Sequence, residues 1–211
     1  MPGYPASAAG RRAACAAAGA LLTTLLTTLL AGCGGGENTA APTPGPSSST
    51  VPAANTAPLP ESPPTKITIP AIKVSAPVDR LGLRPDGRIE EPPLSRPGLT
   101  GWYKEGPTPG EVGPSVVLGH VDANGKAAVF ARLKDLKPGD RIQVTRQDGS
   151  TATFAVERSE RVDKNAFPHK KVFGADLDHA ALRLVTCGGA FDQASGHYKD
   201  NLIVYTRLVT T

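Results

Sequence analysis

Residues 141–156 read RIQVTRQDGSTATFAV, and their pattern predicts the class of fold. Polar and apolar side chains alternate over residues 141–145 and again over residues 151–156. Alternation with a period of two is typical of a β-strand with one buried face. Because the turn sequence Gln147-Asp148-Gly149-Ser150 separates the two runs, the segment predicts a β-hairpin.

Similar short runs occur on both sides of this hairpin. They cover residues 67–69, 72–78, 115–119, 182–186 and 202–206, and turn residues interrupt the chain between them. The helical candidates are short, such as residues 127–133. Seven or eight short strands at this spacing predict an all-β fold, either a barrel or a sandwich.

The composition divides the chain into two parts. Of its 211 residues, 23 are glycine and 21 are proline, well above the average share. Residues 1–64 hold 10 of the prolines but only four charged residues, whereas residues 65–211 hold the other 38 charges and nine of the ten aromatics. We therefore predict one folded domain over residues 65–211. The net charge of +4 comes without a basic run, which argues against nucleic-acid binding.

Residues 1–33 have the features of an export signal. Arg11 and Arg12 precede an uncharged stretch of 18 residues, 13–30. The sequence Leu30-Ala31-Gly32-Cys33 then resembles the bacterial lipobox, which implies cleavage before Cys33 and attachment of a lipid to its sulfur. The alternative is an uncleaved membrane anchor. In both cases we expect the domain to be tethered at the extracytoplasmic face of the cell membrane.

Residues 34–64 are predicted to be a disordered linker. The segment carries eight prolines among Ser, Thr, Ala and Gly residues, with two charges and no aromatic side chain. Such a segment buries too little apolar surface to order itself, and its prolines favour an extended form of roughly 3 Å per residue.

Two candidate catalytic residues follow predicted strands. His120 and Asp122 come directly after residues 115–119, and Cys187, Gly188 and Gly189 come after residues 182–186. A cysteine nucleophile needs a base such as histidine to form its thiolate, and glycines let backbone N–H groups approach a substrate carbonyl. Taken alone, a cysteine in an apolar strand is more often a small core residue, and a lone histidine is more often structural.

Five blocks of sequence, in this order, resemble the sortases, and among them the actinobacterial class F group. The blocks are residues 69–78 (IPAIKVSAPV), 101–111 (GWYKEGPTPGE), 118–122 (LGHVD), 186–189 (TCGG) and 197–201 (HYKDN). The resemblance covers residues 67–208, nearly the whole predicted domain.

This resemblance implies an eight-stranded β-barrel cysteine transpeptidase that acts on an LPXTG-like sorting signal. Cys187 would attack the Thr–Gly carbonyl and form an acyl-thioester, and His120 would protonate the leaving amine and later deprotonate an incoming amine, such as a cell-wall precursor. Asp122 would orient His120 or the substrate, or else cap a turn, and Gly188 and Gly189 would help to position the carbonyl. We expect a monomer that needs no cofactor and no metal.

The third family residue departs from the pattern. The family has an arginine near the start of the last strand, where this sequence has Lys199. Arg207 lies eight residues further on, roughly 26 Å along an extended strand. Lysine supplies a charge but lacks the planar fork of arginine. We therefore predict that Lys199 holds this position, the alternative being a solvated surface lysine.

Two other classes of protein share some of these features. An L,D-transpeptidase also uses cysteine and histidine on a β-fold, but its Ser-His-Gly-Cys context is absent from this sequence. A non-catalytic envelope lipoprotein that binds a sorting-signal peptide or a wall component stays open as the alternative function. Hydrolysis without transfer is a further outcome when no acceptor amine is present.

Overall fold

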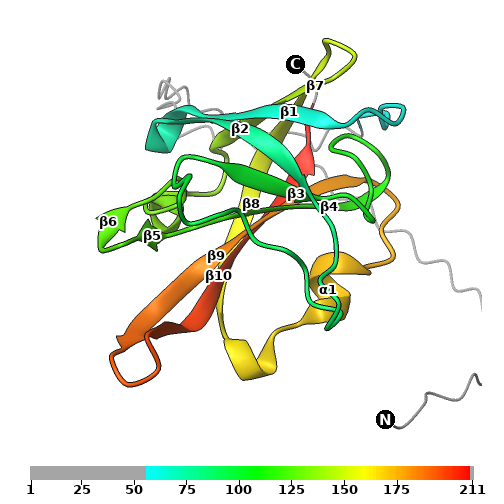
Figure 1. Ribbon diagram of the computed structural model, residues 1–211. Coiled ribbons are helices and arrows are strands. Elements are labelled where there is room, and N and C mark those ends of the chain that lie inside the picture. The colour runs from blue at the N-terminus through cyan, green and yellow to red at the C-terminus, as the bar shows by residue number, and fades with distance from the viewer. Residues whose placement is uncertain (1–55, 210–211) are drawn as a thin grey trace, which may run out of the picture. The chain divides into compact units, whose positions relative to one another are not determined.

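The computed structural model describes residues 56–209, which form a closed barrel of eight strands in the order β1-β2-β3-β4-β9-β10-β8-β7 (Figure 1). The all-β prediction is confirmed. The barrel strands are β1 (Pro64–Ile69), β2 (Val74–Leu81), β3 (Thr100–Tyr103), β4 (Gly113–Gly119), β7 (Arg141–Arg146), β8 (Thr151–Asp163), β9 (Ala180–Asp192) and β10 (His197–Leu208). The predicted signal segment with Cys33, and most of the predicted linker, lie outside the described residues.

The remaining elements are short. Strands β5 (Asp122–Ala123) and β6 (Lys126–Ala127) form a separate two-stranded sheet, and the helices are η1 (Pro70–Ile72), η2 (Leu133–Asp135), η3 (Lys164–Ala166) and α1 (His169–Phe173). Within the described part of the chain, none of the helices is long and apolar enough to cross a bilayer.

The predicted hairpin is the pair β7–β8. Ile142 lies opposite Phe154, and Val144 lies opposite Ala152. All four side chains are buried in the core, because alternate residues of each strand point to the inside of the barrel. Figure 1 shows β9 and β10 side by side, with their hairpin extending beyond the other strands.

Several element boundaries differ from those that the sequence predicts. Strand β8 continues to Asp163, β9 continues to Asp192, and β10 begins at His197. These extensions contain charged residues and glycines, whose low strand preference gives no signal in the sequence. The predicted helix over residues 127–133 is wrong: the chain pairs in β6 at its start and forms only the turn η2 at its end, where Phe130 and Leu133 are buried in the core.

The segment before β1 packs against the barrel. The buried Arg146 donates hydrogen bonds from its guanidinium to the backbone carbonyls of Pro60 and Ser62. The Leu59 amide donates to the Gly110 carbonyl at 2.8 Å. These residues belong to the stretch assigned to the linker from composition. The buried Arg146, 86 positions away from Pro60, satisfies the carbonyls of Pro60 and Ser62.

Candidate active site

One pocket of about 790 Å³ brings together Cys187 and His120, the two residues that the sequence singles out for chemistry. Asp122 also lines it. The remaining lining comes from the β2–β3 connection, the β5–β6 turn, the start of η3 and the β9–β10 hairpin: Arg84, Glu91, Pro92, Pro93, Leu94, Val121, Ala123, Asn124, Gly125, Lys164, Phe191, Gly196, His197 and Tyr198.

The parallel pairing of β4 with β9 places the two reactive residues beside each other. The ladder runs from Gly113 opposite Ala180 to Leu118 opposite Val185. Two residues further along both strands, the same register puts His120 level with Cys187. Neighbouring strands lie about 4.8 Å apart, so this register alone accounts for a histidine next to the thiol. Because the ladder ends at Leu118, β9 is open on this side and the pocket forms there.

The imidazole of His120 is held by the β2–β3 connection. Its Nε2 lies 2.6 Å from the carbonyl oxygen of Pro92. A carbonyl only accepts, so Nε2 carries the proton and Nδ1 is the nitrogen that can exchange a proton with other groups. The ring is thereby fixed in one tautomer.

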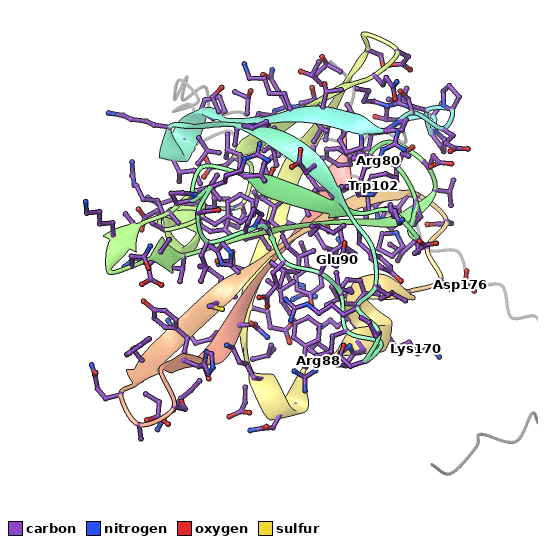
Figure 2. The ribbon with its side chains drawn as sticks, viewed as in Figure 1. Arg80, Arg88, Glu90, Trp102, Lys170 and Asp176 are labelled. Atoms are coloured by element: carbon purple, nitrogen blue, oxygen red, sulfur yellow. The ribbon has the colours of Figure 1, made fainter. Side chains whose placement is uncertain are left out.

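The β2–β3 connection is itself tied back to the barrel. The Gly82 amide donates to the Glu90 carboxylate at 2.7 Å, and the Glu90 amide donates to the Gly82 carbonyl at 3.0 Å. Figure 2 shows Glu90 within this connection, below the strands that carry Arg80 and Trp102. The two bonds fix the start of the connection and so help to bring Pro92 to His120.

The Cys187 thiol is half-buried, and its pKa is raised above the ordinary value. Burial is the largest cause, and the carboxylates of Glu91 and Asp122 raise the pKa further, whereas the ammonium of Lys164 lowers it by its charge and by a hydrogen bond. At neutral pH the resting thiol is therefore mostly protonated. Only a minor fraction of the protein holds the reactive thiolate at any moment.

Asp122 contacts a tyrosine in the pocket. Tyr198 lines the pocket with it, and the pKa of Tyr198 is raised by burial and then by the negative charge of Asp122. An ionised carboxylate only accepts hydrogen bonds, so Asp122 cannot stabilise an oxyanion. It is suited to accept hydrogen bonds from donor groups of a substrate. The predicted role of Asp122 in positioning substrate stays a prediction.

The structure places Gly188 and Gly189 within β9, whereas the sequence pattern predicts that they lie just beyond a strand end. Asp200 pairs with Gly188, and Tyr198 pairs with Phe191, so two residues of β9 oppose one of β10 between these pairs. Gly189 has a positive φ of 76° at this β-bulge. Neither glycine is a pocket-lining residue.

Lys199 is the residue of β10 that faces this bulge. Its side chain is exposed, and it is not part of the pocket lining. The residue directly opposite Cys187 is Asn201. The structure therefore does not bring Lys199 to the thiol, and it places Lys164 there, a residue that the sequence analysis did not single out.

No sequence signal identifies Lys164 or Glu91 as pocket residues, and Tyr198, although it lies in the block 197–201, is not singled out. They come from three different connections or strands, and only the closure of the barrel brings these together. Over residues 56–209, no group of three His, Cys, Asp or Glu side chains is arranged to hold a metal ion. Metal-independent chemistry stays a prediction.

The chain belongs to the sortase family, because the sortase domain model matches residues 67–209. No curated protein matches it. The matched segment contains every barrel strand except the first residues of β1.

Solved sortases share the fold. Sortase A from Corynebacterium diphtheriae is 23% identical with a TM-score of 0.54, and the match covers 72% of this chain and 63% of that one. Sortase C-1 from Actinomyces oris is also 23% identical with a TM-score of 0.54, over 69% of this chain and 73% of that one. Sortase C-1 from Streptococcus pneumoniae is 19% identical with a TM-score of 0.54, over 70% and 67%. The chain thus spans less than two thirds of the length of the Corynebacterium protein.

Proposed function

We propose that this sortase-family protein is a cysteine transpeptidase. It cleaves an LPXTG-like sorting signal between Thr and Gly and transfers the threonyl group to an amine. The observation that carries the proposal is the common pocket of Cys187 and His120, set by the β4–β9 register. The sequence blocks shared with class F sortases support the same substrate class.

Each step of the proposed reaction uses a group of the pocket. The thiolate of Cys187 attacks the threonine carbonyl carbon, and the C–N bond to glycine breaks as the glycine nitrogen takes a proton from the His120 imidazolium. An acyl-thioester on Cys187 remains. The acceptor amine then attacks this carbonyl, loses a proton to the imidazole, and releases the thiolate. Overall, the Thr–Gly amide bond is broken and a new amide bond to the acceptor is formed.

The hydrogen bond from His120 to Pro92 has a defined part in this scheme. It keeps the proton on Nε2, so Nδ1 takes up and returns the proton of each step. A backbone carbonyl thereby fixes the ring orientation, a task that a carboxylate performs in other hydrolases.

Lys199 is retained in the proposal as the cation of the family arginine position, where it would bind the substrate carbonyls. If this placement is right, Lys199→Arg raises turnover, because the guanidinium fork donates two parallel hydrogen bonds. Unchanged or reduced turnover in this variant argues against the placement.

The proposal includes the location. Lipidated Cys33, or an uncleaved anchor over residues 1–33, would tether the domain at the extracytoplasmic face of the cell membrane, where sorting signals and amine acceptors meet. Radiolabelled palmitate incorporation, compared between the wild type and Cys33→Ala, distinguishes the lipid from the anchor.

The central test compares the wild type with Cys187→Ala on an LPXTG peptide supplied with an amine acceptor. We expect the transfer product, and a covalent acyl adduct on Cys187 by mass spectrometry, from the wild type alone. Equal product from both proteins refutes the proposal. Peptide binding without turnover, together with a thiol inert to mild alkylation, supports the non-catalytic envelope lipoprotein instead.

A further inference from the structure

The pocket is lined by two permanently charged cations, and they differ in their surroundings. Arg84 lies 3.6 Å from the Glu91 carboxylate, so its charge is compensated within the β2–β3 connection. Lys164 forms no ion pair with any carboxylate in the described part of the chain, and it lines the same pocket as Cys187, where its positive charge lowers the pKa of the thiol. The uncompensated cation of the pocket is therefore the one at the thiol.

The barrel order places Lys164 there. In β10, Asn201 pairs with Val162 of β8 on one side and with Cys187 of β9 on the other. Val162 and Cys187 are thus two strand spacings apart, about 10 Å between Cα atoms. Lys164 follows Val162 by two residues, and both Lys164 and Cys187 line the pocket, so the lysine and the thiol face the same space.

The turn at the end of β8 holds Lys164 in this place. The Asp163 carboxylate accepts a hydrogen bond from the Asn165 amide at 2.7 Å and caps η3. Lys164 is the first residue of that turn and is half-buried, whereas Lys199 is exposed. A half-buried cation whose backbone is fixed loses little conformational freedom when it contacts the thiolate.

We propose that Lys164 is a catalytic residue that stabilises the Cys187 thiolate through direct contact with the sulfur. This inference rests on the proposed function for its catalytic meaning. During ionisation the proton leaves Sγ for the His120 imidazole, and Lys164 stays protonated and holds the negative charge that forms on sulfur. In this chain, the positive charge next to the nucleophile is supplied by Lys164, in the connection between β8 and β9.

The groups around the thiol explain why such a cation is needed. Burial and the carboxylates of Glu91 and Asp122 all oppose ionisation of Cys187, and Lys164 opposes them. The titratable or charged groups that line the pocket with Cys187 are Arg84, Glu91, His120, Asp122, Lys164, His197 and Tyr198. Without the lysine, the two carboxylates and the burial of the thiol would oppose the ionisation of Cys187 with little to offset them.

The test measures the rate at which iodoacetamide alkylates Cys187 in the full-length protein, as a function of pH. Mass spectrometry quantifies the alkylated Cys187 peptide. We expect Lys164→Met to slow alkylation at pH 7 about tenfold, because an adjacent opposite charge favours the ionised form by about this factor. The rate should recover at high pH, where the thiol ionises without help. Lys164→Arg keeps the charge and should stay close to the wild type.

Lys170→Met is the matched control. Lys170 is exposed on α1, which Figure 2 shows on the opposite side of the view from the β9–β10 hairpin. An alkylation profile of Lys164→Met that coincides with that of the wild type, or an equal slowing in Lys170→Met, overturns the inference. Thermal unfolding of each variant confirms that the fold is retained, and Lys164→Arg shows whether the charge itself is what matters.

Turnover separates this inference from the proposed function. With an LPXTG peptide and an acceptor amine, Lys164→Met should lower kcat about tenfold at pH 7, change KM little, and recover activity at high pH. If the wild type cleaves no peptide while the alkylation shift appears, the proposed function fails and Lys164 still controls the thiol. If the wild type turns over and Lys164→Met is equally active at pH 7, the catalytic role of Lys164 is refuted.

Discussion

Gly189 cannot be replaced by alanine without a large loss of stability, whereas its neighbour Gly188 can. An added Cβ at Gly189 would lie 2.1 Å from Oδ2 and 2.6 Å from Cγ of Asp200, and φ there is +76°. The left-handed backbone costs a non-glycine residue about 1–2 kcal/mol, and such an overlap typically costs about 1–3 kcal/mol. Gly189→Ala should therefore lower the free energy of unfolding by about 3 kcal/mol.

Gly188→Ala is the control for this prediction. Its φ is not positive, and an added Cβ would meet Leu202 Cβ at 3.5 Å, an ordinary contact distance. We expect a change of less than about 1 kcal/mol. By thermal unfolding, Gly189→Ala should melt about 6–12 °C below the wild type, given about 2–4 °C per kcal/mol in a domain of this size.

A double variant separates the two causes. Asp200→Ala removes Oδ2 and Cγ, the two closest atoms, and leaves the Asp200 Cβ at 2.9 Å. Combined with Gly189→Ala, it should recover most of the loss that comes from overlap and leave the part that comes from φ. If Gly189→Ala and Gly188→Ala melt at the same temperature, the bulge does not require a glycine and the reasoning is refuted.

Three further predictions concern the barrel. The pKa of Glu160 is lowered to about 2 by hydrogen bonds from Lys171 and Arg158. The ionised carboxylate therefore stabilises the fold by about 1 kcal/mol above pH 4.5, and this stabilisation is lost as the pH falls toward 2. In urea unfolding, the stability of Glu160→Gln should depend less on acid pH than that of the wild type, and an equal dependence would contradict this. Arg146→Met should leave two backbone carbonyls unpaired and lower the free energy of unfolding by about 2–4 kcal/mol. Proteolysis of the segment before β1 should become faster. An unchanged cleavage rate would show that the arginine does not hold this segment. Trp102→Phe should cost about 1–2 kcal/mol in chemical denaturation, because its indole donates to the Pro107 carbonyl at 3.0 Å; a stability equal to that of the wild type would rule out this bond as a contributor.

The sequence predicts the barrel because its strands carry their pattern locally. The alternation over residues 141–156 reports a buried and an exposed face directly, and β7 and β8 follow it. The extensions of β8, β9 and β10 toward the β9–β10 hairpin have no such pattern, because only parts of them pack against the core. Their pairing with each other, within the β9–β10 hairpin and between β8 and β10, keeps them extended.

The candidate site likewise contains residues that the sequence predicts and residues that it does not. Cys187 and His120 could be singled out because each follows an apolar run, and parallel pairing of those runs then makes them neighbours. Lys164 could not be found, because its place beside the thiol depends on β8 lying next to β10. Lys199 is predicted from a family pattern, and in the structure it faces the bulge at Gly189, is exposed and lies outside the pocket.

The contacts of Arg146 decide where a mechanical load enters this domain. Tension on the chain before residue 59 first stretches the bonds from the Leu59 amide to Gly110 and from the Arg146 guanidinium to Pro60 and Ser62. The force passes into β7 and the loop before β4, and β1 is loaded only after these bonds break. Gly110 lies three residues before the first rung of the β4–β9 ladder, Gly113 opposite Ala180, so part of the load reaches the strand that leads to His120.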